Sequence, residues 1–260
     1  MIPNASITAW RSVVPWSSSA QVEQDLLLSR LIVEIANDAL LGTELIFRGG
    51  TCFHKLYLPA PLRYSEDLDY VRRTNSAIGP IFDALRAIGE RVGMKVNTEI
   101  TRHPKVYLRA PFEDGSGRMR IKIEMNTHET SSALDPVRVP FSVRSSWWEG
   151  SASVQTFAIE ELVATKIRAL YQRRKGRDLF DLWLALEHLH LDPERIVAAF
   201  AIYRPDGYSS DRAIDVLAGH VANPVFRADL GALAVVLPFD YDIDAAAALV
   251  SDRLLSEINF

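Results

Sequence analysis

Hydrophobic residues recur at helical spacing near the start of the chain. In residues 21–41 the apolar positions are Val22, Leu26, Leu27, Leu31, Ile35 and Ala39. Steps of three and four residues place such side chains on one face of a helix. The helix is predicted to follow an N-cap at Ser19 and to end at Gly42. Residues 80–92 repeat the pattern and predict a second helix that stops at Gly93.

Alternating patterns predict a series of strands between and after these helices. A short strand is predicted over residues 44–47 and another around residues 67–71, and four more follow at 95–101, 105–110, 118–126 and 137–143. The clearest alternation is in 118–126, where Arg118, Arg120, Lys122, Glu124 and Asn126 share one face. The turn residues at 113–117 predict a hairpin between two of these strands.

The two ends of the chain have patterns of a different kind. Residues 1–19 contain Pro3 and Pro15 and predict an extended arm. Trp10 and Trp16 would anchor this arm either on the body of the protein, which is the favoured interpretation, or on a partner. Beyond residue 150 nearly all apolar positions have helical spacing, including helices at 193–203, 210–221 and 242–258. We therefore predict an α/β (α+β) protein with a mixed-sheet lobe over residues 1–150 and a helical lobe over residues 151–260.

Two carboxylates lie on the predicted strand at residues 67–71. Asp67 and Asp69 are two positions apart, so they lie on the same face of that strand. Like charges side by side repel unless a cation lies between them. Mg²⁺ is commonly held by one or two carboxylates together with substrate phosphates. An isolated Asp-x-Asp is more often a solvated turn, so the pattern alone leaves both interpretations open.

A Gly-Gly-Thr turn precedes the aspartates by about fifteen residues. Gly49, Gly50 and Thr51 lie between the first strand and a short amphipathic segment, Cys52 to Leu58. Backbone N–H groups at such a turn can bind a phosphate, although most turns of this kind are only structural. A phosphate-binding turn followed by a pair of metal-binding carboxylates predicts a nucleotidyl-transfer site.

The predicted strand at 118–126 offers a third carboxylate. Glu124 lies on the polar face of this strand. One interpretation is an ordinary strand with a solvated face. The other is that Glu124 helps to hold the metal or activates the attacking hydroxyl.

Charged residues also interrupt the helical part. Lys166 lies on an otherwise apolar stripe, where a lysine either extends to water or binds phosphates. Arg173, Arg174, Lys175 and Arg177 precede two aspartates, Asp178 and Asp181, on one helical face. Buried aspartates need partners, and the candidates are Arg174, Arg177 and Lys166. The set is either a structural salt-bridge network or part of a nucleotide site.

Composition limits the classes of function only weakly. The net charge of −4 does not indicate a nucleic-acid binder, so any such binding needs a local basic patch. A single cysteine, Cys52, excludes an internal disulfide and a multi-cysteine metal site, and fits a reducing cytoplasm. No signal peptide or membrane-length apolar run is found, and the six histidines lack metal-ligand spacing.

Taken together, these motifs resemble the AbiEii/AbiGii-type nucleotidyltransferase toxins, which include the MenT enzymes. The resemblance rests on Gly49-Gly50-Thr51, on Arg63-Tyr64-Ser65-Glu66-Asp67-Leu68-Asp69, on Lys166 and on Arg177-Asp178-Leu179-Phe180-Asp181. It covers roughly residues 45–190. It implies a nucleotidyltransferase-type sheet and a cytoplasmic enzyme that uses an NTP with Mg²⁺ or Mn²⁺. It further implies a tRNA 3′ end as the acceptor and a cognate antitoxin as a partner.

The same resemblance assigns roles to individual residues. Asp67 and Asp69 would hold the metal, and Lys166 and Asp181 would line the active site. Glu124 joins this catalytic set as the candidate third carboxylate from the strand pattern. The nucleotide-binding set would be Gly49, Gly50, Thr51, Arg63, Ser65, Lys166, Arg174, Arg177 and Asp178. We expect the NTP to lie between the glycine turn and Lys166. The alternatives are nucleotidyl transfer to a small molecule or a protein, and a nucleotide-binding module without turnover.

Overall fold

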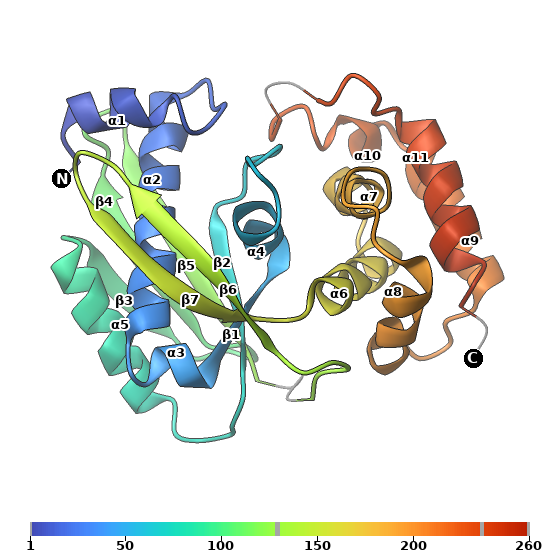
Figure 1. The fold of residues 1–260 in the computed structure, drawn as a ribbon, viewed down its shortest axis with the longest axis horizontal. Coiled ribbons are helices and arrows are strands. Elements are labelled where there is room, and N and C mark those ends of the chain that lie inside the picture. The colour runs from blue at the N-terminus through green and yellow to red at the C-terminus, as the bar shows by residue number, and fades with distance from the viewer. Residues whose placement is uncertain (1, 128–130, 235–236, 259–260) are drawn as a thin grey trace. The chain divides into compact units, whose positions relative to one another are not determined.

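The computed structural model describes residues 2–127, 131–234 and 237–258, and it divides the chain into two compact units (Figure 1). The first unit comprises residues 1–131 and 136–157, and the second comprises residues 132–135 and 158–260. Residues 132–135 belong to the second unit, although the chain returns to the first unit after them for residues 136–157.

The first unit is built on a seven-stranded mixed sheet with strand order β3-β4-β5-β2-β1-β7-β6. Its strands are β1 (Leu45–Arg48), β2 (Asp67–Arg72), β3 (Lys95–Glu99), β4 (Lys105–Pro111), β5 (Arg118–Asn126), β6 (Val137–Arg144) and β7 (Glu149–Thr156). Its helices are α1 (Asn4–Trp10), α2 (Ser19–Asn37), α3 (Leu41–Glu44), α4 (Gly49–Leu56) and α5 (Gly79–Arg91). The pairs β2–β5 and β1–β7 are parallel, and the other pairs are antiparallel. The predicted α/β class is confirmed.

One face of the sheet carries the hydrophobic core of the first unit. Met119, Ile121, Ile123 and Met125 of β5 are buried, whereas the residues between them are exposed or half-buried. Helices α2 and α5 contact this part of the sheet. Every second strand residue therefore packs under a helix, and the intervening residues form an opposite, polar face. The alternation read from the sequence is confirmed.

The expectation of an extended arm over residues 1–19 is wrong, because α1 forms there. Pro3 lies just before the first helical residue, where a missing N–H costs nothing. The indole nitrogens of Trp10 and Trp16 donate to the two carboxylate oxygens of Asp25 at 2.9 and 3.0 Å. Lys55 completes the cluster at 2.7 Å from Asp25 Oδ1. The predicted packing of both tryptophans on the body of the protein is confirmed.

Helix α2 also ends earlier than its apolar spacing predicts. It stops at Asn37, where Asp38 becomes extended and its carboxylate accepts the N–H groups of Leu40 and Leu41. Gly42, predicted as the helix stop, lies inside the short helix α3 instead.

The prediction that the chain is helical after residue 150 is wrong for residues 151–156. Strand β7 runs through Glu149–Thr156, pairs with β1 in parallel at Phe47 and Thr156, and lies between β1 and β6 in the sheet. Only its last three residues are buried, so its sequence has no apolar alternation. The boundary expected after residue 150 falls inside this strand, whereas the two units divide near residue 157.

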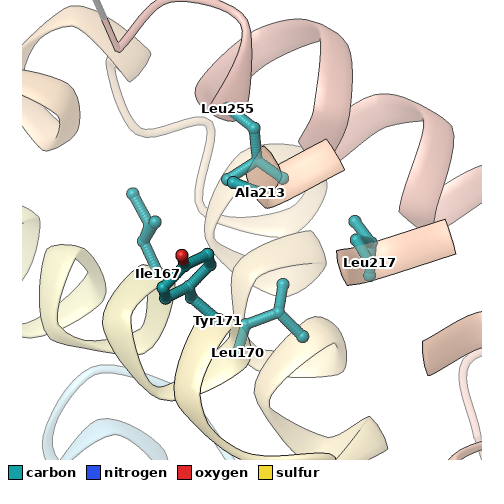
Figure 2. Close-up of a pocket in the computed structure, with 6 residues that line it drawn as sticks. All are labelled: Ile167, Leu170, Tyr171, Ala213, Leu217 and Leu255. Carbon is teal, nitrogen blue, oxygen red and sulfur yellow. The ribbon is translucent and has the colours of Figure 1, made fainter. Parts of the chain in front are cut away.

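The second unit is helical. It contains α6 (Ile159–Gln172), α7 (Gly176–Trp183), the π-helical turn η1 (Leu184–His188), α8 (Pro193–Phe200), the 3-10 turn η2 (Ala201–Tyr203), α9 (Ser210–Val221), α10 (Pro224–Ala228), α11 (Ile243–Val250) and the π-helical turn η3 (Ser251–Leu255). Its core includes a small apolar pocket, seen in Figure 2, lined by Ile167, Leu170, Tyr171, Ala213, Leu217 and Leu255. The helices predicted at 193–203, 210–221 and 242–258 are present in broad outline.

A buried carboxylate joins residues 132–135 to the second unit. Glu161 of α6 is fully buried and accepts the backbone N–H groups of Ala133 and Leu134 at 2.8 and 2.9 Å. The hydroxyl of Tyr203 donates to the same carboxylate. In the part of the chain that the structure describes, no helix is long and apolar enough to cross a bilayer.

Candidate functional site

The glycine pair forms a close turn from β1 into α4. Arg48 is extended, Gly49 has φ +82°, and α4 begins at once with Gly49 and Gly50. A positive φ favours glycine because a Cβ would be strained there. A Cβ on Gly49 would also lie 2.5 Å from Asp69 Oδ2, and one on Gly50 would collide with the guanidinium of Arg63. Two of the predicted site residues, Asp69 and Arg63, therefore lie in close contact with this turn.

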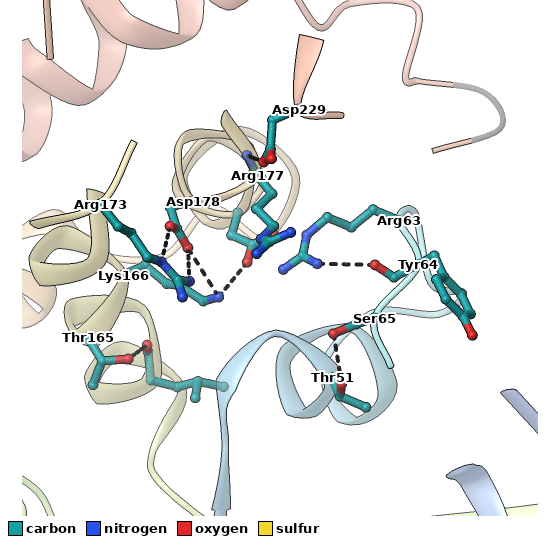
Figure 3. A network of polar contacts seen from close by, with 12 residues as sticks. Thr51, Arg63, Tyr64, Ser65, Thr165, Lys166, Arg173, Arg177, Asp178 and Asp229 are labelled. Carbon is teal, nitrogen blue, oxygen red and sulfur yellow. Dashed lines mark hydrogen bonds and ion pairs between the residues drawn. The ribbon is translucent and has the colours of Figure 1, made fainter. Parts of the chain in front are cut away.

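Thr51 ties α4 to the aspartate strand. Its hydroxyl is buried and lies 2.8 Å from Ser65 Oγ (Figure 3). It also lies 2.5 Å from the carbonyl oxygen of Asp67. The sequence predicts Thr51 as a member of the nucleotide-binding set. Its contacts are those of a positioning group that fixes the start of β2 against the first turn of α4.

The carboxylates of Asp67, Asp69 and Glu124 share one face of the sheet. Asp67 and Asp69 alternate with buried Leu68 and Tyr70 along β2. In the parallel pairing of β2 with β5, Asp69 lies opposite Glu124 and Asp67 lies opposite Lys122. The antiparallel pairing of β1 with β2 adds Arg48 opposite Asp69. Strand pairing thus gathers residues that are far apart in sequence, 55 positions in the case of Asp69 and Glu124.

Lys122 lies between two of the carboxylates. Its ammonium nitrogen is 3.1 Å from Asp67 Oδ2 and 3.0 Å from Glu124 Oε2. Burial disfavours the charged amine, but the hydrogen bonds and attraction of Glu124 and Asp67 are stronger and raise the pKa of Lys122. Lys122 is therefore a permanent cation in this acidic group.

The environment of Asp69 destabilises the charged form of its carboxyl group. Burial and the negative charge of Asp67 raise the pKa of Asp69, while the positive charges of Arg48 and Lys122 act in the opposite direction. A carboxylate in this environment gains free energy when an additional cation approaches it.

These residues fit a divalent cation that is shared with a substrate. Among the described residues no group of three or more His, Cys, Asp or Glu side chains is arranged to hold a metal. Asp67 and Asp69 nevertheless offer two hard oxygen ligands on one face, beside the first turn of α4. A Mg²⁺ ion usually completes so small a ligand set with water and phosphate oxygens.

Arg63 lies close behind the glycine turn. It is 3% exposed, its guanidinium adjoins Gly50, and it donates to the carbonyl oxygen of Tyr64 at 3.4 Å. A buried guanidinium beside a helix N-terminus favours an anion. Of the predicted nucleotide-binding set, the structure brings together Gly49, Gly50, Thr51, Arg63 and Ser65.

The predicted residues of the second unit form a buried charge network of their own. Lys166 Nζ lies 3.7 Å from Asp178 Oδ1 (Figure 3) and 2.7 Å from Asp181 Oδ2. All three side chains are buried. The side chain of Lys166, on α6, does not extend to water. It pairs instead with the two aspartates on the adjacent helix α7. This geometry joins the residues that the sequence singled out but does not by itself give them a role in nucleotide binding.

The structure corrects part of the prediction about which cations pair with the buried aspartates. Arg173, which the sequence did not select, donates from Nε and Nη2 to the two oxygens of Asp178 at 2.7 Å each. Arg174 is exposed, and the backbone N–H of Arg177 donates to Asp229. Arg173 is the first residue after α6, and its backbone turns extended there, which aims its side chain back at α7.

Sequence reasoning also missed Lys122 and Arg48 as members of the acidic group. Both lie on strands and look like ordinary polar-face residues when each strand is considered alone. A signal was present for Lys122, because it shares the polar face of β5 with Glu124 two residues away. Arg48 precedes the glycine pair directly, but only the β1–β2 register brings it to Asp69.

Comparisons with known proteins agree with this fold. MenT4, a nucleotidyltransferase toxin from Mycobacterium tuberculosis, matches 100% of this chain and 91% of its own chain at a TM-score of 0.64 and 16% identity. JHP933 from Helicobacter pylori matches 93% of this chain and 92% of its own at a TM-score of 0.57 and 16% identity. At this identity the likeness shows a shared fold. No curated protein matches the chain.

The family comparison covers most of the chain, including both groups of charged residues. The model of the nucleotidyl transferase AbiEii toxin of type IV toxin–antitoxin systems matches residues 30–246. This range contains the glycine turn, the aspartate strand, Lys166 and the Asp178–Asp181 helix. The chain belongs to the AbiEii family of nucleotidyltransferase toxins.

Proposed function

We propose that this nucleotidyltransferase transfers a nucleoside monophosphate from an NTP to an RNA acceptor, the 3′ end of a tRNA, in a Mg²⁺-dependent reaction. The carrying observation is the group formed by Asp67, Asp69 and the first turn of α4. In this group the carboxylate of Asp69 lies beside backbone N–H groups of α4 that have no side-chain cap, and Asp67 lies two residues away on the same face of β2. One element suits the metal, and the other suits the triphosphate. The sequence resemblance supports the acceptor.

The proposed reaction is an in-line displacement at the α-phosphorus. The acceptor hydroxyl oxygen forms a bond to the α-phosphorus, the bond to the β-phosphate oxygen breaks, and pyrophosphate leaves. Bound Mg²⁺, held by Asp67 and Asp69, would supply charge stabilisation of the phosphates. Glu124, beside Asp69 on the same face, is proposed to accept the hydroxyl proton.

The remaining residues of the first unit position these groups. Thr51 and Ser65 hold the aspartate strand against α4, and Arg63 supports the glycine turn at its buried side. We propose that the N–H groups of Gly49 and Gly50 bind the phosphates. Roles of Lys166, Arg174, Arg177, Asp178 and Asp181 toward the nucleotide stay predictions, as does Mn²⁺ in place of Mg²⁺.

The direct test combines purified protein, total tRNA, Mg²⁺ and each of the four α-labelled NTPs. We expect label on tRNA with one nucleotide, its loss on addition of EDTA, and its loss in the isosteric variant Asp69→Asn. Asp83→Asn, an exposed aspartate of α5 paired with Arg86, is the matched control and is expected to retain activity. A folded, fully active Asp69→Asn would contradict the proposed site.

Other outcomes select the alternatives. Label on a small molecule or on a protein, with none on RNA, would show that the protein is a nucleotidyltransferase with a different class of acceptor. Stable NTP binding without any product would favour a binding module without turnover. Membership of a toxin–antitoxin family further implies a cognate antitoxin as a partner, which co-expression of the neighbouring gene would test by rescue of growth.

A further inference from the structure

The polar face of the sheet continues beyond the aspartates as an open, basic surface on β3, β4 and β5. Antiparallel pairing places Lys95 opposite Arg109, Arg109 opposite Arg120, and Tyr107 opposite Lys122. Directly opposed residues share a face. We call this surface the open face. Its members are Lys95, Asn97, Glu99, Lys105, Tyr107, Arg109, Pro111, Arg118, Arg120, Lys122, Glu124 and Asn126.

The open face is positive although the whole chain is negative. It carries six cationic side chains and two acidic ones, against a net charge of −4 for the chain. The helices that contact β3, β4 and β5 pack on the apolar face instead, where Val96 and Leu108 lie against Gly89 of α5. Arg118, Arg120 and Lys95 are exposed.

At the centre of the open face two arginines share one aromatic ring. Arg109 Cζ lies 5.3 Å and Arg120 Cζ lies 5.4 Å from the ring centroid of Tyr107. The two arginines are opposite each other on paired strands, where like charges cost free energy. Asn97 orients Arg109 through a hydrogen bond of 2.8 Å. An anion bound between the two guanidinium groups would remove their repulsion.

This cluster is aligned with the proposed reaction site. Arg120, Lys122 and Glu124 follow one another on the same side of β5, and Lys122 and Glu124 lie opposite Asp67 and Asp69. Arg120 and Glu124 are four positions apart along the strand, a distance of about 13 Å. A chain of phosphates that starts at the aspartates can therefore reach both arginines along the strand.

We infer that the open face binds the single-stranded end of the acceptor RNA, with backbone phosphates on Arg109 and Arg120 and a base stacked at Tyr107. The inference rests on the proposed function, because it presumes an RNA acceptor. Single-stranded RNA is recognised by this combination of cationic contacts and stacking on aromatic or guanidinium planes. A surface that bound only phosphate groups would not need the aromatic ring of Tyr107.

The test measures RNA binding apart from turnover. A fluorescent single-stranded RNA is titrated into the Asp69→Asn protein, which holds turnover off, and anisotropy is followed over a range of KCl concentrations. The double variant Arg109→Gln/Arg120→Gln and the single variant Tyr107→Leu are made in this background. The control, Arg86→Gln/Arg91→Gln, removes two equivalent charges from exposed positions of α5, the helix on the other face of the sheet.

We expect the Arg109→Gln/Arg120→Gln pair to raise the Kd for RNA about tenfold or more and to reduce the salt slope by about 1.4. Tyr107→Leu should raise the Kd about fivefold or more with little change in the slope. The control pair should stay within about twofold of the parent. In the Asp69-containing enzyme, the open-face variants should raise the KM for RNA while kcat and the KM for NTP change little.

The outcomes separate this inference from the proposed function. If the parent modifies RNA and the open-face variants bind RNA as tightly as the control pair, the inference is overturned and the function stands. If the parent neither binds nor modifies RNA, both fail together. If the variants lose binding to a purified antitoxin but keep RNA affinity, the open face is a protein interface and the inference is again overturned. Thermal unfolding checks that each variant is folded.

Discussion

At the scale of single residues, the site depends on close approach between backbone and charge. Gly49 is the clearest case, because its positive φ and its contact with Asp69 both exclude a side chain. Thr51 has a similar structural role, since its hydroxyl meets Ser65 and the backbone of Asp67. These positions matter for where the carboxylates lie rather than for contact with the reacting atoms.

We predict that Gly49→Ala lowers the free energy of unfolding by about 1–3 kcal/mol and abolishes most nucleotidyl transfer, because the new methyl group displaces Asp69. Gly79→Ala is the control. It has nothing within 4 Å of the added Cβ and an ordinary φ at the start of α5, so it should be neutral or slightly stabilising. Chemical denaturation and label transfer measure both effects. Equal behaviour of the two variants would contradict the prediction.

At the scale of elements, α6 and α7 are joined by buried charge. Lys166, Asp178 and Asp181 are nearly inaccessible, and Arg173 covers Asp178 from the rim with its own side chain half exposed. Removing one member of such a group leaves an uncompensated buried charge, which costs more than removing both partners. Because of this asymmetry, a comparison of single and double variants can distinguish a structural role of Lys166 from a ligand-binding role.

We predict that Lys166→Met lowers the free energy of unfolding by about 3–5 kcal/mol, because the buried carboxylate of Asp181 loses its ion pair with Lys166. Adding Asp181→Leu should restore at least half of the loss. If Lys166 also binds the nucleotide, the double variant regains stability but not transfer. Urea denaturation and label transfer on the same samples report the two properties. A double variant as unstable as the single one would contradict the charge-pairing explanation.

At the scale of the whole molecule, stability depends on groups that the reaction does not use. His220 of α9 is buried beside Phe226, and among the described residues its Nδ1 has no hydrogen-bond partner. Burial and the charge of Arg174 lower the pKa of His220. A histidine of this kind is held neutral by the fold, and its protonation works against the folded state.

We predict that acidification destabilises the protein partly through His220. The unfolded chain binds the proton near pH 6.5, whereas the folded chain binds it only at lower pH, so stability falls as pH drops below about 6.5. The variant His220→Phe lacks this group and should lose less thermal stability between pH 7.5 and 5.5 than the parent. Thermal unfolding at both pH values makes the comparison. The same pH dependence in both proteins would count against this assignment.

The chain's own pattern determined the local features of this protein. Periodicity alone placed α2, α5 and β5, put Asp67 and Asp69 on one face, and marked the glycine turn, because each depends on residues within a few positions of one another. The pattern failed at α1, where a proline at the helix start looks like a helix breaker. It also failed at β7, whose small polar residues are stabilised by strands β1 and β6 on either side.

Only the tertiary structure decided which distant residues meet. The parallel β2–β5 register brings Glu124 beside Asp69 and Lys122 beside Asp67, and the antiparallel β4–β5 register extends the polar face to Tyr107, Arg109 and Arg120. The packing of α6 on α7 selects Arg173 over Arg174 as the partner of Asp178. The physical reason is common to these cases: backbone periodicity is local, whereas strand register and helix packing are set by burying the whole apolar surface at once.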